Sequence, residues 1–189
     1  MLFNSIFCVV SLLLIHFKFV TSDCVMHGAC DTRRQLMCQN ITQPVNTSST
    51  VKRHCPNVKD ISCCSVDQIQ LVTSGLSRAE YWMGKTSQCF QKMRNMFCEI
   101  HCDANQSQIV EVLKTDKPRS ITGIRVQLKR DFANEMFREC AKLKILWIRI
   151  VDQICIQQPC NAKEFFRSLG ATESMGGSSP YLIEFQFID

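Results

Sequence analysis

The sequence is short of the side chains on which most enzymes depend. It has four histidines, and none of them stands in a matched arrangement with an acid and a nucleophile. Three of its seven glycines fall within residues 170–180, but they do not lie between a strand and a helix, so they do not predict a phosphate-binding loop. We therefore expect a protein without catalytic residues, which is not an enzyme.

Long hydrophobic runs and clustered basic residues are also missing from most of the chain. Beyond residue 22, no stretch is long and apolar enough to cross a bilayer, which takes about 20 residues. The formal charge is +5, but the basic residues are dispersed along the sequence. This dispersion indicates a solvated surface, so we expect no nucleic acid as a partner.

The first 22 residues have the pattern of a secretory signal peptide. An apolar run over residues 6–15 is followed by Val20-x-Ser22, which suits a small-residue cleavage site before Asp23. The run is too short for a membrane span. We expect residues 1–22 to be removed, and residues 23–189 to form a single domain that is secreted or enters the endosomal–lysosomal lumen.

Cysteine is abundant. Loss of Cys8 with the signal peptide leaves twelve of the thirteen cysteines, an even number. In a secreted chain this predicts six disulfides and no free thiol, although spacing alone leaves the connectivity open. Zinc ligation by Cys98 and Cys102, or by Cys155 and Cys160, is an alternative on spacing, but an oxidising compartment favours disulfides.

Three Asn-x-Ser/Thr sites predict N-glycosylation in a secreted protein. They are at Asn40, Asn46 and Asn105, and we expect each of them in a surface loop. Residues 39–54 are rich in Thr, Ser and Asn and show little periodicity. We interpret this segment as an exposed loop.

Two helices are predicted between the cysteines at 63 and 102. Ser65 and Gln68 form a capping-box pattern, which begins the first helix. Gly75 weakens its far end, so we expect it to stop near residues 74–76. The second should begin near Ser87, because Phe90, Met93, Phe97 and Ile100 repeat at helical spacing.

The second helix should be crosslinked to two different parts of the fold. Cys98 and Cys102 are four residues apart and share a face. Cys89 precedes Cys98 by nine residues, about 2.5 turns, and therefore points the opposite way.

The second half of the chain mixes strand and helix patterns. Residues 124–128 and 183–187 alternate as strands do, Asp131 is predicted to cap a helix, and residues 161–169 form a short helix. Residues 170–180 should be mobile. The apolar residues 143–156 suit either a buried helix or an exposed surface for a partner or a membrane. We predict an α+β fold: a mainly helical, disulfide-rich domain with a small mixed β-sheet.

Cysteine motifs over nearly the whole mature chain resemble those of one family. They include Cys24-Val25-x-x-Gly28-x-Cys30, Cys63-Cys64-x-Val66-x-Gln68-x-Gln70, Asn95-x-Phe97-Cys98-Glu99-x-x-Cys102 and Phe132-Ala133-Asn134-x-Met136-x-x-x-Cys140. The chain resembles the luminal N-terminal domain of the Niemann–Pick C type 1 family, a sterol-binding domain. The resemblance implies no cofactor and these disulfides: Cys24–Cys63, Cys30–Cys38, Cys55–Cys98, Cys64–Cys102, Cys89–Cys140 and Cys155–Cys160.

The resemblance also implies an apolar pocket for a sterol. Gln68 matches a residue that hydrogen-bonds the sterol hydroxyl, and Val72 lies one helical turn further on the same face. Wall positions of the pocket are matched by Phe97, Pro180 and Tyr181.

Part of the family's polar site is replaced in this chain. Met37 stands where the family has a second hydroxyl-binding residue, an asparagine, and Ala29 stands in place of a nearby glutamate. Asn95 is a candidate for a second hydrogen bond. With Gln68 as the main anchor, we expect sterols to bind with tolerance at the hydroxyl end, and other elongated lipids to be accepted.

We therefore predict a secreted, monomeric carrier of a sterol or another small hydrophobic lipid. The family's transmembrane spans have no counterpart in the sequence, which predicts a free form. Lipid exchange could involve a soluble Niemann–Pick type sterol carrier or a membrane surface. Gln153 stands where the family's docking surface has leucine, and this favours the membrane. The alternative is a disulfide-rich extracellular interaction module, or a binder of a different hydrophobic ligand.

Overall fold

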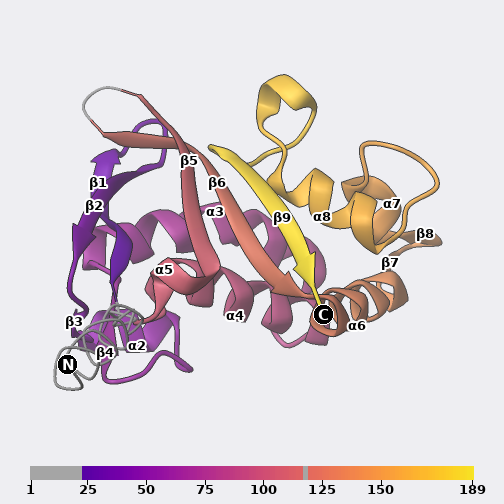
Figure 1. Ribbon diagram of the computed structural model, residues 1–189. Helices are drawn as coiled ribbons and strands as arrows, with labels where there is room; N and C mark the ends of the chain where they lie inside the picture. Colours follow the sequence, from indigo (N-terminus) through magenta and orange to yellow (C-terminus); the bar gives the residue numbers. More distant parts are fainter. Residues whose placement is uncertain (1–22, 117–118) are drawn as a thin grey trace, which may run out of the picture.

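A mixed five-stranded sheet is organised around one central strand, β6. The computed structural model describes residues 23–116 and 119–189, so the predicted signal peptide lies outside the described residues. The strands are β1 (Cys24–Asp31), β2 (Leu36–Thr42), β5 (Val110–Asp116), β6 (Ser120–Lys129) and β9 (Leu182–Ile188). One edge of β6 pairs antiparallel with β5. The other edge of β6 pairs with β2 at Ser120, and from Gly123 onward it pairs in parallel with β9 (Figure 1).

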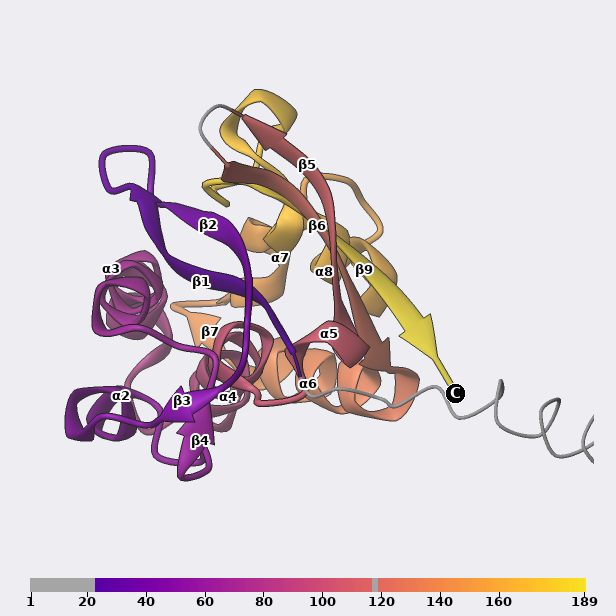
Figure 2. The same cartoon turned by 60° about the vertical axis from the view of Figure 1, so that its left-hand side comes forward.

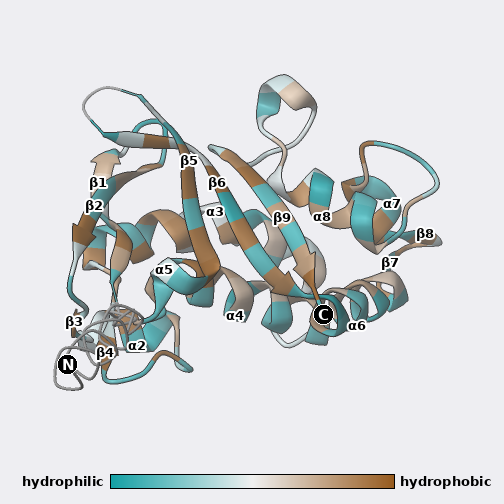
Figure 3. Ribbon diagram, viewed as in Figure 1, coloured by the Kyte–Doolittle hydropathy of each residue, from teal (hydrophilic) through white to brown (hydrophobic). Residues whose placement is uncertain are grey.

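Apolar and polar residues alternate along β6 and β9 (Figure 3). The burial of these strands alternates as well, so this sheet has one apolar face and one polar face. Ile124 and Val126 of β6 are buried, whereas Arg125 lies between them in sequence and is partly exposed. The Arg125 guanidinium bridges Glu111 of β5 and Glu184 of β9, at 2.9 and 3.1 Å. The two strands predicted over 124–128 and 183–187 are therefore confirmed, with their apolar side toward the core.

Helices cover the apolar face of the sheet. The long ones are α3 (Val66–Met83), α4 (Gln88–Cys102), α6 (Arg130–Lys142) and α8 (Ala162–Gly170). Shorter elements are α2 (Ser49–His54), α5 (Gln106–Ile109), α7 (Ile150–Ile154), η1 (Glu173–Met175), β3 (Val45–Asn46), β4 (Ile61–Ser62), β7 (Lys144–Ile145) and β8 (Ile148–Arg149). In the turned view, the β1–β2 hairpin stands beside α3, and β9 lies over α8 (Figure 2).

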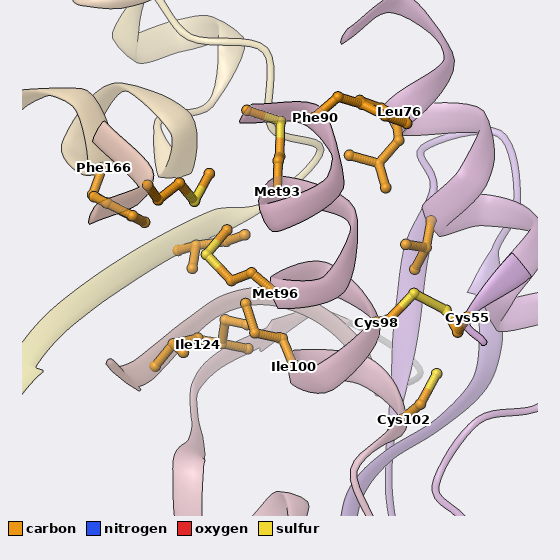
Figure 4. Packing of buried hydrophobic residues seen from close by; sticks show 14 of the residues in the cluster. Cys55, Leu76, Phe90, Met93, Met96, Cys98, Ile100, Cys102, Ile124 and Phe166 are labelled. Carbon is orange, nitrogen blue, oxygen red and sulfur yellow. A yellow bond between two sulfur atoms is a disulfide. The ribbon is translucent and has the colours of Figure 1, made fainter. Parts of the chain in front are cut away.

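Helix α4 is the centre of the core. Figure 4 shows Met96 and Ile100 directed from α4 toward Ile124 of β6 and Phe166 of α8. These four side chains are at most 2% exposed. The apolar stripe that predicts this helix thus faces the sheet. The helix begins after Ser87 as expected, and the Ser87 hydroxyl caps it by accepting from the Phe90 N–H.

Six disulfides brace the helices and strands, which fits an extracellular or luminal domain. The structure holds the same six pairs that the family resemblance implies: Cys24–Cys63, Cys30–Cys38, Cys55–Cys98, Cys64–Cys102, Cys89–Cys140 and Cys155–Cys160. Cys89 joins α4 to α6, whereas Cys98 joins α4 to the end of α2. Helix α4 is therefore tied on two sides.

Helix α3 is longer than predicted. The capping box of Ser65 and Gln68 is present, but the helix continues through Gly75 to Met83 and ends at Gly84, whose φ is +79°. Beyond Gly75, Leu76 and Met83 are buried against the core. A glycine inside a helix costs about 1 kcal/mol, less than the burial of two large apolar side chains contributes.

The segment 39–54 is not the loop that was expected. It contains the end of β2, the short strand β3 and helix α2, whose first turn is capped by Ser48. Asn40 and Asn46 consequently lie on strands, while Asn105 precedes α5. The composition of this segment did not predict these elements. Strand β3 forms by pairing with β4, and β4 lies beyond α2 in the sequence.

Two further predictions are wrong in detail. Asp131 does not cap α6: the N-cap position is Lys129, and Asp131 lies in the first turn, where its charge favours the helix N-terminus. Residues 143–156 do not form one continuous buried helix: they form a hairpin, β7–β8, followed by the short helix α7, in which Ile150 and Val151 are buried. At the turn of this hairpin Leu146 and Trp147 are 80% and 79% exposed.

Within residues 23–116 and 119–189, no helix is long and apolar enough to cross a membrane.

Candidate functional site

A cavity of about 150 Å³ lies between the two wall helices α3 and α4, the turn of the β1–β2 hairpin and the segment that leads into β9. Its apolar lining consists of Met37, Leu71, Val72, Gly75, Leu76, Ala79, Met93, Phe97, Leu169, Pro180 and Ile183, and its polar lining of Gln35, His101, Ser178, Ser179 and Tyr181. None of these lining residues is an aspartate, a glutamate, a lysine or an arginine. The site therefore suits a neutral, mostly apolar ligand.

Five of the seven predicted ligand-binding residues line this cavity. Val72, Phe97, Pro180, Tyr181 and Met37 come together from four different parts of the chain. Gln68 and Asn95 are not among the lining residues. Asn95 is half-buried on α4, two residues before Phe97, and so lies about 200° around the helix from it.

Gln68 is fully buried and its amide is engaged with the backbone. Its Oε1 accepts from the N–H of Gly28 at 3.2 Å and of Ser65 at 3.4 Å. Its Nε2 donates to the carbonyl oxygen of His101 at 3.4 Å. Gln68 thus connects β1, the start of α3 and the last turn of α4, immediately behind the cavity wall.

A second buried glutamine supports the same helix end. Gln106 Nε2 donates to the carbonyl oxygens of Ile100 and His101, at 3.0 and 2.9 Å. Its Oε1 accepts from two N–H groups of β1, both at 2.8 Å. Carbonyls in a last helical turn lack partners within the helix, and these amides supply them. The backbone of His101 is therefore held in place from two sides.

His101 is the main site residue that the sequence analysis missed. It is 2% exposed, and its ring Nε2 lies 2.6 Å from the hydroxyl of Tyr181, which is 3% exposed. Its Nδ1 lies 2.7 Å from the carbonyl oxygen of Phe97. Burial lowers the pKa of His101 to about 4 and raises the pKa of Tyr181 well above its ordinary value of 10. Both groups are consequently neutral at physiological pH.

A helical pattern could have pointed to His101. It lies four residues after Phe97 and eight after Met93, which places all three on one stripe of α4. The pattern would not have revealed Tyr181 as its partner, since the two are 80 residues apart in sequence.

The polar groups of the wall are divided between its two ends. Gln35, Ser178 and Ser179 are partly or largely exposed and lie where the cavity meets solvent. His101 and Tyr181 are buried and form the polar part of the interior. A ligand with a long apolar body and one polar end matches this distribution.

Gly75 lies on the α3 wall beside Leu71 and Leu76. A Cβ atom built at Gly75 would meet no other atom within 4 Å. The glycine that interrupts the helix propensity of α3 therefore leaves open space at the margin of the cavity. A larger side chain at this position has room to enter that space.

The cavity in this structure is smaller than a whole sterol needs. Sites for drug-sized ligands measure roughly 300–1,000 Å³, so about 150 Å³ holds only part of such a molecule. Met37 and Met93 stand in the wall, and methionine adapts its shape easily because it is unbranched and flexible. Complete enclosure of a sterol therefore requires side chains or the 178–180 segment to move outward.

A disulfide holds the two wall helices together at one end. Cys64, directly before α3, is joined to Cys102, the last residue of α4 and the neighbour of His101. Every cysteine in the described part of the chain belongs to such a pair, so none there offers a thiolate to zinc. Asn40, Asn46 and Asn105 are not among the lining residues, so glycans on them would not originate in the cavity.

Comparison with known proteins points to one family. The family model described as Niemann-Pick C1 N terminus matches residues 21–189. A relative from Caenorhabditis elegans, named NPC intracellular cholesterol transporter 1 homolog 1, is 22% identical over an alignment 197 positions long, which covers 89% of this chain. A relative from Sus scrofa, NPC intracellular cholesterol transporter 1, is 24% identical over an alignment 148 positions long, which covers 68% of this chain.

Both relatives are much longer than the matched region. The match spans 14% of the Caenorhabditis elegans protein and 12% of the Sus scrofa protein. The similarity thus concerns one domain of each relative.

Proposed function

Because the chain belongs to the family described as Niemann-Pick C1 N terminus, we propose that it binds a sterol in the cavity between α3 and α4. The observation that carries this proposal is the wall itself, which is apolar and uncharged and has one buried polar pair. A sterol has the same division, with a large hydrocarbon body and a single hydroxyl. The two relatives are named as cholesterol transporters, which supports this class of ligand.

Burial of hydrocarbon supplies most of the binding free energy. Removing apolar surface from water contributes roughly 25 cal/mol per Å². The walls formed by α3 and α4 are themselves braced by Cys64–Cys102, so little ordering of the helices is needed on binding. We assign Val72, Phe97, Met37, Pro180 and Tyr181 to the lipid-contacting surface. Gln68 as a direct hydroxyl anchor stays a prediction.

We expect the protein to act by binding and release of the lipid, a role supported by the two relatives that are named as cholesterol transporters. We expect the protein to work as a monomeric carrier in the extracellular space or in the endosomal–lysosomal lumen.

Exchange of lipid with a membrane surface is the mode of delivery that we propose. Leu146 and Trp147 project at the turn of hairpin β7–β8, and Ile148 beside them is 43% exposed. Leu146 has φ of +58°, a conformation that costs an ordinary residue about 1–2 kcal/mol. Tryptophan and leucine with Lys144 and Arg149 at the hairpin base suit the interfacial region of an anionic bilayer. A soluble Niemann–Pick type carrier is the alternative partner.

A direct binding experiment tests the proposed function. Purified, fully disulfide-bonded protein is mixed with radiolabelled cholesterol, and bound label is measured with and without excess unlabelled sterol. Saturable binding with one sterol per chain is expected, together with a sterol in organic extracts of the purified protein, identified by mass spectrometry. If the oxidised protein binds no sterol, the function passes to the alternative of an extracellular interaction module or a binder of another hydrophobic ligand.

A further inference from the structure

The hydrogen bond between His101 and Tyr181 has a fixed direction. Nδ1 of His101 faces a carbonyl oxygen, that of Phe97, at 2.7 Å. A carbonyl oxygen only accepts, so Nδ1 must carry the proton of the neutral ring. Nε2 is then without a proton, and it accepts the hydroxyl proton of Tyr181 across 2.6 Å.

This arrangement leaves the tyrosine oxygen with lone pairs and no free proton. A phenolic hydroxyl has one proton to donate, and His101 takes it. Toward the cavity, the buried polar pair therefore offers acceptor capacity only. Gln68 does not change this balance, because its amide is directed to Gly28, Ser65 and His101 and it is not among the lining residues.

We propose that the Tyr181 hydroxyl oxygen accepts a hydrogen bond from the hydroxyl of a bound lipid, and that His101 makes the site selective for lipids that donate. The inference rests on the proposed function, since a lipid must first occupy the cavity. Tyr181 is the contact residue. His101 is a positioning residue, which acts by orienting the tyrosine proton away from the ligand.

The selectivity follows from the hydrogen bonds that a ligand without a donor would fail to make with Tyr181. A sterol hydroxyl donates to the tyrosine oxygen, whereas a ketone oxygen at the same place is an acceptor that meets another acceptor. Tyr181 could turn its proton to the ketone only by leaving His101 Nε2 without a partner in a buried environment. An unpaired buried polar group is costly, and a site built around such groups rejects ligands that leave them unpaired.

A carboxylate is disfavoured on the same grounds. An ionised carboxylate only accepts hydrogen bonds, and the cavity wall contains no lysine or arginine to pair with its charge. A fatty acid with its carboxylate at the buried end therefore lacks any favourable partner there. This expectation differs from the broad tolerance inferred from Gln68 as the main anchor, because the tyrosine and histidine supply a second polar element.

Competition binding measures this selectivity directly. Radiolabelled cholesterol on the wild-type protein is displaced by unlabelled cholesterol, by its 3-keto analogue and by its 3-O-methyl ether. We expect cholesterol to compete about 10–100 times better than the ketone or the ether, the range that corresponds to one hydrogen bond in a buried site.

Two variants separate the roles of the pair. In Tyr181→Phe the acceptor is lost, so cholesterol affinity should fall to the level of the ketone while ketone affinity is retained. In His101→Leu the tyrosine proton is freed, so the ketone should gain affinity and the preference for cholesterol should shrink or reverse. Tyr81→Phe is the matched control: Tyr81 is the other tyrosine in the sequence, is 80% exposed and does not line the cavity, so its variant should bind as the wild type does.

The outcomes distinguish this inference from the proposed function. Sterol binding with equal affinity for cholesterol and ketone, unchanged in Tyr181→Phe, would overturn the inference and leave sterol binding in place. Absence of any sterol binding by the wild type would overturn the proposed function itself. If His101→Leu does not fold, the single-oxygen change in Tyr181→Phe decides, with its thermal transition as the check on folding.

Discussion

The side-chain amide of Gln68 and the carbonyl oxygen of His101 are 3.4 Å apart, which joins the first turn of α3 to the last turn of α4. The same glutamine closes the capping box with Ser65. One buried side chain therefore both starts the first wall helix and supports the residue that forms the polar interior of the cavity. Its removal should affect stability and ligand binding together.

Replacement of Gln68 by alanine is expected to destabilise the fold by about 1–3 kcal/mol, because buried backbone groups lose their partners. We also expect cholesterol affinity to fall by about one to two orders of magnitude. Urea unfolding and cholesterol binding are measured on the same sample. Gln106→Ala is the matched control, since Gln106 is also fully buried and also holds the His101 carbonyl. Equal losses of affinity in both variants would mean that Gln68 acts through His101 and does not touch the lipid.

Gly75 permits a test that blocks the cavity without damaging the core. Gly75→Leu should reduce sterol binding at least tenfold, because its side chain enters open space at the cavity margin. Stability should rise by about 1 kcal/mol through improved helix propensity. Ser74→Leu serves as the control, since Ser74 is exposed on the same turn of α3 and does not line the cavity. Full sterol affinity in Gly75→Leu would argue against binding at this place.

The stability of the protein should depend on pH through His101. Burial lowers its pKa from 6.5 to about 4, so between these values the unfolded chain binds a proton that the native state does not. The free energy of unfolding therefore falls as the pH falls through this window, by roughly 3 kcal/mol over 2.5 pH units. Above pH 6.5 the stabilisation linked to neutral His101 is fully present. The adjacent Tyr181 stays neutral throughout, since its pKa is raised by burial.

Urea unfolding of the wild type and His101→Gln, from pH 4 to 7.5, measures this dependence. Glu99 on the same helix has its pKa raised by desolvation and contributes in the opposite direction, but both proteins contain it, so their difference isolates His101. The variant should show a flatter profile. Identical profiles would mean that His101 takes up a proton equally well in the folded and unfolded states.

Hairpin β7–β8 should govern the rate of transfer from vesicles. Leu146→Ser and Trp147→Ser are expected to slow cholesterol transfer from anionic vesicles several-fold, with stability unchanged within about 0.5 kcal/mol because both side chains are exposed. Ile41→Ser is the control, as Ile41 is 73% exposed on β2. Strong acceleration of transfer by a soluble Niemann–Pick type carrier, lost only in the hairpin variants, would assign the hairpin to that carrier.

Local patterns were sufficient for the elements whose signals lie close together in sequence. The capping box at Ser65, the apolar stripe of α4 and the alternating residues of β6 and β9 each depend on neighbours within a few positions. The family resemblance added the pairing of the cysteines, which spacing alone leaves open. The α+β class thus followed from local patterns, and the family resemblance also supplied five of the lining residues.

Tertiary packing decided what those patterns left open. Helix α3 crosses Gly75 because Leu76 and Met83 find a core to pack against, and β1 pairs with β2 through shifted registers that show no simple alternation. Leu146 and Trp147 belong to an apolar sequence, yet the hairpin turn places them in solvent. The contact of His101 with Tyr181 joins residues 80 positions apart, and only the folded chain brings that histidine and that hydroxyl into one wall.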